Sequence, residues 1–185
     1  IHTWIKQNPI GNGNGWEPYP TSLRIVNWIK WHFSENSLNE ESLTSLAIQA
    51  RYMTKSIEYH LLGNHLFANA KALVFAGLFF EGPEADEWYK IGFNILAKQI
   101  PEQFLDDGSH FELSTTYHSL LTEDLLDIIQ LMNNTNRVVP QNWKETAHKA
   151  VNWLTVMTRP DGLPPLFNDA AYGISPSIDE VLWLC

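Results

Sequence analysis

The fold depends on one apolar stretch, Leu66-Phe67-Ala68-Asn69-Ala70-Lys71-Ala72-Leu73-Val74-Phe75-Ala76-Gly77-Leu78-Phe79-Phe80. Apolar or small residues recur along it at helical spacing, at positions 66, 70, 73, 77 and 80. Its other faces are also mostly apolar. Because a helix that is apolar on all sides is buried in a core, the sequence predicts a central helix over Leu66–Phe80.

Helical patterns continue on both sides of this stretch. Asn39 is expected to cap the helix that precedes the apolar stretch, and Gly63 is expected to break that helix. Thr21 or Ser22 is expected to cap the first helix, and Pro101 to end or offset the one that precedes it. The other predicted helices are Thr21–Phe33, Asn39–Leu61, Glu84–Ile100, Ser114–Met132, Gln141–Thr158 and a last one from Ser177 onward.

These patterns indicate an all-α fold, since no convincing pair of strands is present. Helices with short connections form antiparallel hairpins, as in a bundle, a solenoid or an α/α toroid. The chain has no fixed sequence repeat. Its eight tryptophans favour a toroid with an aromatic cleft, because sugars stack on such rings. We therefore expect an incomplete α/α toroid of antiparallel helical hairpins, preceded by a Gly- and Asn-rich loop within residues 1–20.

Composition excludes several classes of partner. The 185 residues are 44% hydrophobic and 18% charged, so disorder is not expected. A formal charge of -9 argues against binding to nucleic acid, which needs a basic face. An acidic polysaccharide would need a locally basic or neutral site. The candidate cations for such a site are Arg24, Arg51, Lys55 and Lys71.

Both ends of the sequence suggest a longer protein. The chain lacks a starting methionine and stops inside the helix-like segment 178–185, and Ile1–Trp4 is not a signal peptide. No apolar run reaches the length of a membrane span. Cys185 is the single cysteine, which excludes an internal disulfide and a cysteine-based metal site.

Two segments concentrate polar chemistry between these helices. Asp106–His118 holds two histidines, a tyrosine, acidic residues and several hydroxyls. Leu62–Ala70 places an amide, an imidazole and a second amide at the start of the apolar helix. Together they predict a polar site on a helical scaffold, although Asp106-Asp107-Gly108 is most simply a turn.

Three blocks of the sequence resemble the helical domain of the heparinase II/III-like polysaccharide lyases, a family with alginate-lyase relatives. The blocks are Gly15–Arg24, Gly63–Asn69, and Asp107–Glu112 with Tyr117-His118. The resemblance implies that residues 1–185 are a fragment of the α/α-toroid domain. It also implies a C-terminal β-sandwich domain, absent from this chain, that acts as a partner and supplies further residues.

The resemblance implies cleavage of a uronic-acid-containing polysaccharide by β-elimination. This reaction needs a group that neutralises the uronate carboxylate, a base for the C5 proton and an acid for the leaving oxygen. By resemblance Asn64 is the neutralising amide, Tyr117 the proton-transferring residue and His65 an imidazole that holds or assists the substrate. The alternatives are a helix cap for Asn64, a core position for Tyr117, and a structural histidine for His65.

Other residues are expected to bind the substrate or to support the site. Trp16, Glu17 and Arg24 form a sugar-stacking wall or, alternatively, a packing contact at the start of the first helix. His110 and Glu112 belong to the loop that orients Tyr117, and His118 lines the polar pocket or is structural. No cofactor and no metal are expected, since His60 and His65 lack a carboxylate at ligand spacing.

Two other functions stay open at this point. One is a non-catalytic carbohydrate-binding helical domain in the assembly of a surface polysaccharide. The other is an α/α-toroid glycoside hydrolase that uses Glu112 with Glu123 or Asp124 as paired carboxylates. A degradative lyase would be periplasmic or secreted.

Overall fold

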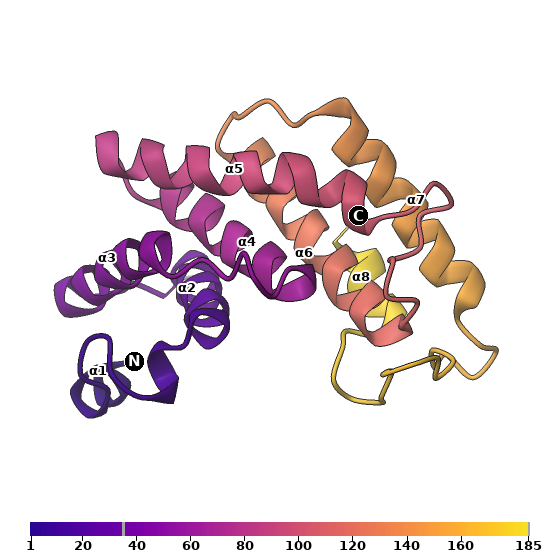
Figure 1. Cartoon of the computed structure of the whole chain (residues 1–185), viewed down its shortest axis with the longest axis horizontal. Coiled ribbons are helices and arrows are strands. Elements are labelled where there is room, and N and C mark those ends of the chain that lie inside the picture. Colours follow the sequence, from indigo (N-terminus) through magenta and orange to yellow (C-terminus); the bar gives the residue numbers. More distant parts are fainter. Residues whose placement is uncertain (35, 185) are drawn as a thin grey trace. The chain divides into compact units, whose positions relative to one another are not determined.

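The computed structural model describes residues 1–34 and 36–184, so Cys185 lies outside the described residues. The described residues form eight α-helices and one short 3₁₀ helix, with no paired strands beyond one isolated antiparallel bridge between Phe104 and His110 (Figure 1). The all-α prediction is confirmed. The chain divides into two compact units, Ile1–Leu96 and Ala97–Cys185. The helices are α1 (His2–Gln7), η1 (Asn14–Trp16), α2 (Pro18–Phe33), α3 (Glu40–Lys55), α4 (Gly63–Phe79), α5 (Pro83–Gln103), α6 (Thr115–Asn134), α7 (Gln141–Met157) and α8 (Ile178–Trp183).

The first unit is built around α4. Every residue from Leu66 to Gly77 is buried, and α4 packs against α2 and α3. Gly77 makes room for the start of α5, since a Cβ at this position would lie 2.4 Å from the backbone nitrogen of Tyr89. The apolar stretch therefore forms the predicted core helix, which begins three residues earlier than expected.

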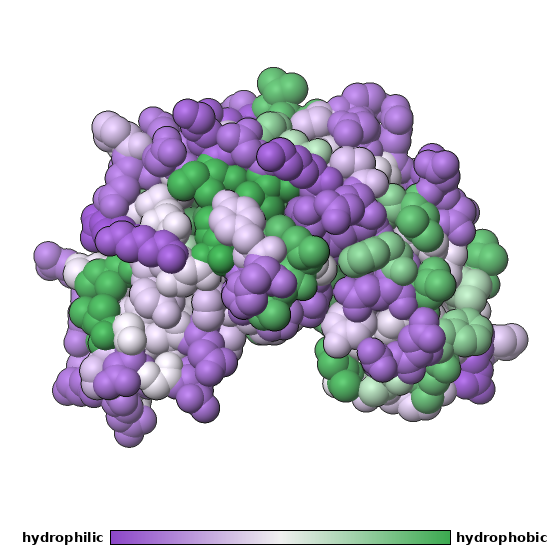
Figure 2. Space-filling view, in the orientation of Figure 1, coloured by the Kyte–Doolittle hydropathy of each residue, from purple (hydrophilic) through white to green (hydrophobic). Residues whose placement is uncertain are grey.

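The second unit is built around α6, which packs on α7 and α8. Its core holds Leu121, Leu125 and Ile128 from α6 together with Trp143 from α7. A capping box at Ser177 and Glu180 starts α8. Apolar side chains also show on the visible surface of both units (Figure 2). Trp31 and Trp183 are 53% and 86% exposed.

The structure corrects several predicted helix bounds. Pro18 starts α2, because a proline at the first helical position gives up no intrahelical hydrogen bond. Asn39 caps α3 as predicted, its Oδ1 accepting from the backbone of Ser42 at 2.9 Å. That helix ends at Lys55 rather than Leu61. Pro101 lies inside α5 and does not end it.

The first twenty residues are more regular than expected, because α1 and η1 lie in the predicted loop. The positions of the tryptophans also differ from the expected aromatic cleft. Four of the eight are buried, namely Trp16, Trp28, Trp88 and Trp143, and these rings fill the cores of the two units. Within residues 1–34 and 36–184, no helix is both long and apolar enough to cross a membrane.

Candidate active site

Asn64 lies in the first turn of α4. The N-cap position of this helix belongs to Leu62, so the capping role considered for Asn64 is wrong. The side chain of Asn64 is part-exposed and makes no hydrogen bond to any described residue. Its amide is therefore available to a ligand at the positive end of the helix dipole, where a carboxylate is favoured.

His65 follows Asn64 and is fixed by a buried carboxylate. Its Nδ1 lies 3.1 Å from Oε1 of Glu58, a residue in the loop between α3 and α4. The His65 side chain is 36% exposed and that of Glu58 only 9%. The ring of Tyr19, from α2, packs on the imidazole with its centroid 4.5 Å away. His65 thus has a defined orientation with one edge toward solvent.

Asn69, one helical turn after His65, holds Glu58 in place. Its Oδ1 accepts from the backbone N–H of Glu58 at 2.8 Å, and its Nδ2 donates to Oε2 of the carboxylate at 3.0 Å. The same Nδ2 lies 3.0 Å from Oγ of Ser22 in α2. These tertiary hydrogen bonds explain why α3 ends early, since Glu58 uses its backbone N–H outside the helix.

Tyr117 lies in the first turn of α6. The side chain is part-exposed, and its hydroxyl has no hydrogen-bond partner among the described residues. The core alternative for Tyr117 is therefore not supported. The hydroxyls beside it have other roles. Thr115 donates to the carbonyl of Pro165, and Thr116 exchanges hydrogen bonds with the backbone of Ala171, so both brace the start of α6.

His118 and His110 lie in the core rather than in a polar pocket. Each is 1% exposed. Nε2 of His118 donates to the carbonyl of Ala150 at 3.0 Å, and Nε2 of His110 donates to Oε1 of Gln103 at 3.1 Å. Burial lowers the pKa of His118 to about 4 and that of His110 to about 3. Their burial contradicts a direct contact with substrate and supports the structural alternative.

The loop before α6 packs against the backbone of α7. Gly108 has φ +93°, and a Cβ there would lie 2.5 Å from the carbonyl oxygen of Lys149. The backbone N–H of Ser109 donates to Asp107 at 2.9 Å, which confirms the turn predicted at Asp106-Asp107-Gly108. The backbone carbonyl of Glu112 accepts from Asn168 at 3.1 Å. Glu112 is thus part of the segment that leads into α6.

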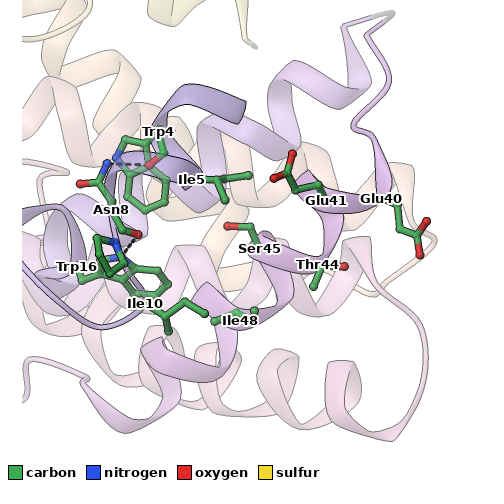
Figure 3. A pocket seen from close by; sticks show the side chains of 11 residues that line it. Trp4, Ile5, Asn8, Ile10, Trp16, Glu40, Glu41, Thr44, Ser45 and Ile48 are labelled. Atoms are coloured by element: carbon green, nitrogen blue, oxygen red, sulfur yellow. Dashed lines mark hydrogen bonds between the residues drawn. The ribbon is translucent and has the colours of Figure 1, made fainter.

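Trp16 belongs to the core of the first unit. It is 2% exposed, its indole N–H donates to the carbonyl of Asn8 at 3.3 Å, and its ring contacts those of Trp4 and Tyr52. One edge lines a pocket of about 650 Å³ between α1 and α3 (Figure 3). None of Asn64, His65 and Glu17 lines this pocket. This burial fits the packing alternative for Trp16, and Glu17 is exposed just before α2.

Arg24 is a structural cation. Its guanidinium donates to Oε1 of Gln49 at 2.7 Å, to the carbonyl of Gly15 at 2.6 Å and to Thr21 at 3.1 Å. It also lies 3.8 Å from the ring centroid of Trp4. Burial lowers the pKa of Arg24 to about 10. With these contacts Arg24 ties the Gly15 loop to α2 and α3, which leaves little of it for a sugar.

Strained backbone precedes α4 and α6, the helices that carry Asn64 and Tyr117. Leu62 has φ 58° and Leu113 has φ 55°, and these are the only described residues other than Gly and Asn with positive φ. Leucine rarely adopts this conformation. Leu62 stands two residues before Asn64, and Leu113 four before Tyr117. Strain of this kind often accompanies functional sites.

The structure therefore brings some predicted residues together and separates the roles of others. Asn64 and His65 share one helical turn in the first unit, while Tyr117 starts a helix of the second unit. Sequence reasoning missed Glu58, Asn69 and Ser22 as a network around His65. The spacing of His65 and Asn69, four residues apart, was the available indication that both face one partner.

This arrangement is that of a helical domain with polar groups at the starts of two core helices. The chain matches the family described as Heparinase II/III N-terminus over residues 1–180, and it belongs to that family. A heparin-sulfate lyase of Bacteroides thetaiotaomicron is 29% identical over 188 residues, which covers 90% of this chain and 27% of the relative. A heparin-sulfate lyase of Bacteroides stercoris is 30% identical over 199 residues, with 90% and 29% covered.

A crystal structure of heparinase III has the same fold, with a TM-score of 0.80 and 26% identity over 96% of this chain and 30% of the other. The expected fold class, an incomplete α/α toroid, is thereby confirmed. The chain spans less than a third of the length of each of these relatives.

Proposed function

We propose that this chain is the helical part of a polysaccharide lyase that cleaves a heparan-sulfate-like, uronic-acid-containing polysaccharide by β-elimination. The observation that carries the proposal is the unpaired, part-exposed amide of Asn64 beside an oriented His65. The names of the relatives, heparin-sulfate lyases, support the substrate class. As part of the proposal, residues 1–185 act within a longer protein whose β-sandwich domain completes the site.

In the proposed reaction the uronate carboxylate binds at Asn64. The amide donates a hydrogen bond to it, which stabilises the negative charge that develops when C5 loses its proton. The C5–H electrons form the C4–C5 double bond, and the bond between C4 and the glycosidic oxygen breaks. Tyr117 is proposed to give its proton to that oxygen, and a base of the complete protein takes the proton from C5.

The structure gives the other two functions less support. The hydrolase would use Glu112 with Glu123 or Asp124 as paired carboxylates. The sugar-stacking wall expected at Trp16 is not formed, because Trp16 is buried. Neither is favoured by a specific observation.

Incubation of the full-length protein with heparan sulfate tests the proposal. A lyase releases products with a C4–C5 double bond, seen as new ultraviolet absorbance. A hydrolase releases reducing ends without that absorbance, and a binding domain releases neither. Reducing ends without absorbance, or binding without products, would overturn the proposed function.

A further inference from the structure

The loop between α3 and α4 contains an acidic residue that the proposed reaction does not yet use. Glu58, taken as a whole residue, is 7% exposed. Both of its carboxylate oxygens face side chains of α4. Of the partners found for it in the described part of the chain, His65 alone can carry a positive charge. A carboxylate is seldom buried without a partner that depends on it.

We propose that Glu58 is a positioning residue that fixes the tautomer of His65, an inference that rests on the proposed function. An ionised carboxylate only accepts hydrogen bonds, so the His65 nitrogen that faces Oε1 must carry a proton. In the neutral imidazole the proton is therefore on Nδ1, and Nε2 keeps its lone pair. Nε2 has no partner among the described residues, so it offers an acceptor beside the amide of Asn64.

Asn69 determines which kind of atom the side chain at position 58 must present to it. The backbone N–H of Glu58 is a fixed donor, so the Asn69 atom that faces it is the oxygen. The Asn69 nitrogen then faces the other carboxylate oxygen of Glu58 at 3.0 Å, and it needs an acceptor there. Whatever side chain stands at position 58 must therefore present an oxygen to Asn69.

Glu58→Gln turns this constraint into a test. Glutamine has one oxygen, which Asn69 requires, so its NH₂ group must face Nδ1 of His65. Nδ1 then has to accept, and the proton moves to Nε2. The substitution keeps the size of the side chain while reversing the tautomer.

The imidazole ¹⁵N shifts of His65, recorded under alkaline conditions where histidines are neutral, report the tautomer directly. His65→Gln assigns the signals. We expect a protonated Nδ1 in the native chain, a protonated Nε2 in Glu58→Gln, and the native pattern in Glu87→Gln, a matched change at an exposed position. In the full-length protein Glu58→Gln should lower kcat/KM roughly 10- to 100-fold, the cost of losing a group that orients a functional histidine.

The ¹⁵N measurement and the activity measurement distinguish the further inference from the proposed function. A protonated Nε2 in the native chain overturns the inference even if Glu58→Gln fails to fold. A reversed tautomer with unchanged kcat/KM also overturns it, because the orientation of His65 would then not matter to the reaction. Absence of lyase activity in the native full-length protein refutes the proposed function alone, and the ¹⁵N measurement still decides whether Glu58 sets the tautomer.

Discussion

Asn69 makes two hydrogen bonds to Glu58, accepting from its backbone N–H at 2.8 Å and donating to its carboxylate at 3.0 Å. Asn69 is fully buried, in the middle of the helix that fills the core of the first unit. One amide thus joins the most buried helix to the loop that leads into the candidate site. The position of His65 depends on this contact through Glu58.

Asn69→Ala is expected to destabilise the protein. It leaves a buried N–H and a buried carboxylate oxygen without partners, and each unsatisfied group costs about 1–3 kcal/mol. We expect the free energy of unfolding in urea to fall by about 2–5 kcal/mol. Asn94→Ala, an exposed position in α5, is the control and should change it little. Equal stability of the two variants would show that the Asn69 bonds are not important.

Tyr117→Phe is expected to remove activity and keep the fold. The hydroxyl has no hydrogen bond to any described residue, so its loss leaves no group unsatisfied. A group that transfers a proton contributes about 10²- to 10⁴-fold to the rate. In the full-length protein kcat should drop by about that factor at an unchanged melting temperature. A variant that keeps most of its kcat would assign Tyr117 a structural role.

Asn64→Asp is expected to impair catalysis without loss of stability. Asn64 is the second residue of α4, where an acidic side chain is favoured by the helix dipole. Against a substrate carboxylate about 3 Å away, however, the new charge costs on the order of 5 kcal/mol at an effective dielectric of about 20. That is a rate loss of roughly several thousandfold at neutral pH.

The loss in Asn64→Asp should be partly rescued in acid, because a protonated Asp can again donate a hydrogen bond. The pH profile of kcat/KM in the full-length protein measures this rescue. Native activity of the variant at neutral pH would exclude contact between Asn64 and the carboxylate.

His118 is expected to make stability depend on pH. Burial lowers its pKa to about 4 in the folded chain, against about 6.5 for an exposed imidazole. The unfolded chain therefore binds the proton more readily. The stability contributed by neutral His118 is fully present above about pH 6.5 and is lost as pH falls toward 4.

His118→Gln removes this pH-dependent contribution to the free energy of unfolding. Between about pH 7 and pH 5, the free energy of unfolding of the native chain should fall by about 2 kcal/mol more than that of the variant. His148→Gln, an exposed change in α7, should keep the native pH dependence. Urea unfolding at the two pH values measures both. Parallel curves for native chain and His118→Gln would show that His118 is not buried in its neutral form.

Much of the fold follows from local patterns. The apolar run predicted α4, and Asn39 and Ser177 marked the starts of α3 and α8. The end of α3 was not predictable in this way, because it depends on a hydrogen bond between Glu58 and a residue eleven positions later. Local propensity carries no information about such a partner.

The candidate site was predictable in part for a similar reason. The resemblance pointed to Asn64, His65 and Tyr117, and the structure leaves their side chains part-exposed. Trp16, Arg24 and His118 are residue types that bind sugars in many proteins, and here all three make their contacts within the protein. Only tertiary packing distinguishes an aromatic ring that fills a core from one that meets a ligand.

The two leucines with left-handed backbone have a consequence for protein engineering. Leu62 and Leu113 are 49% and 56% exposed, so neither gains much from burial to offset a conformation that costs roughly 1–2 kcal/mol. A library screened for heat resistance alone should therefore enrich Gly or Asn at both positions. Because these positions set the direction in which α4 and α6 begin, a library screened for turnover would retain residues that a stability screen discards.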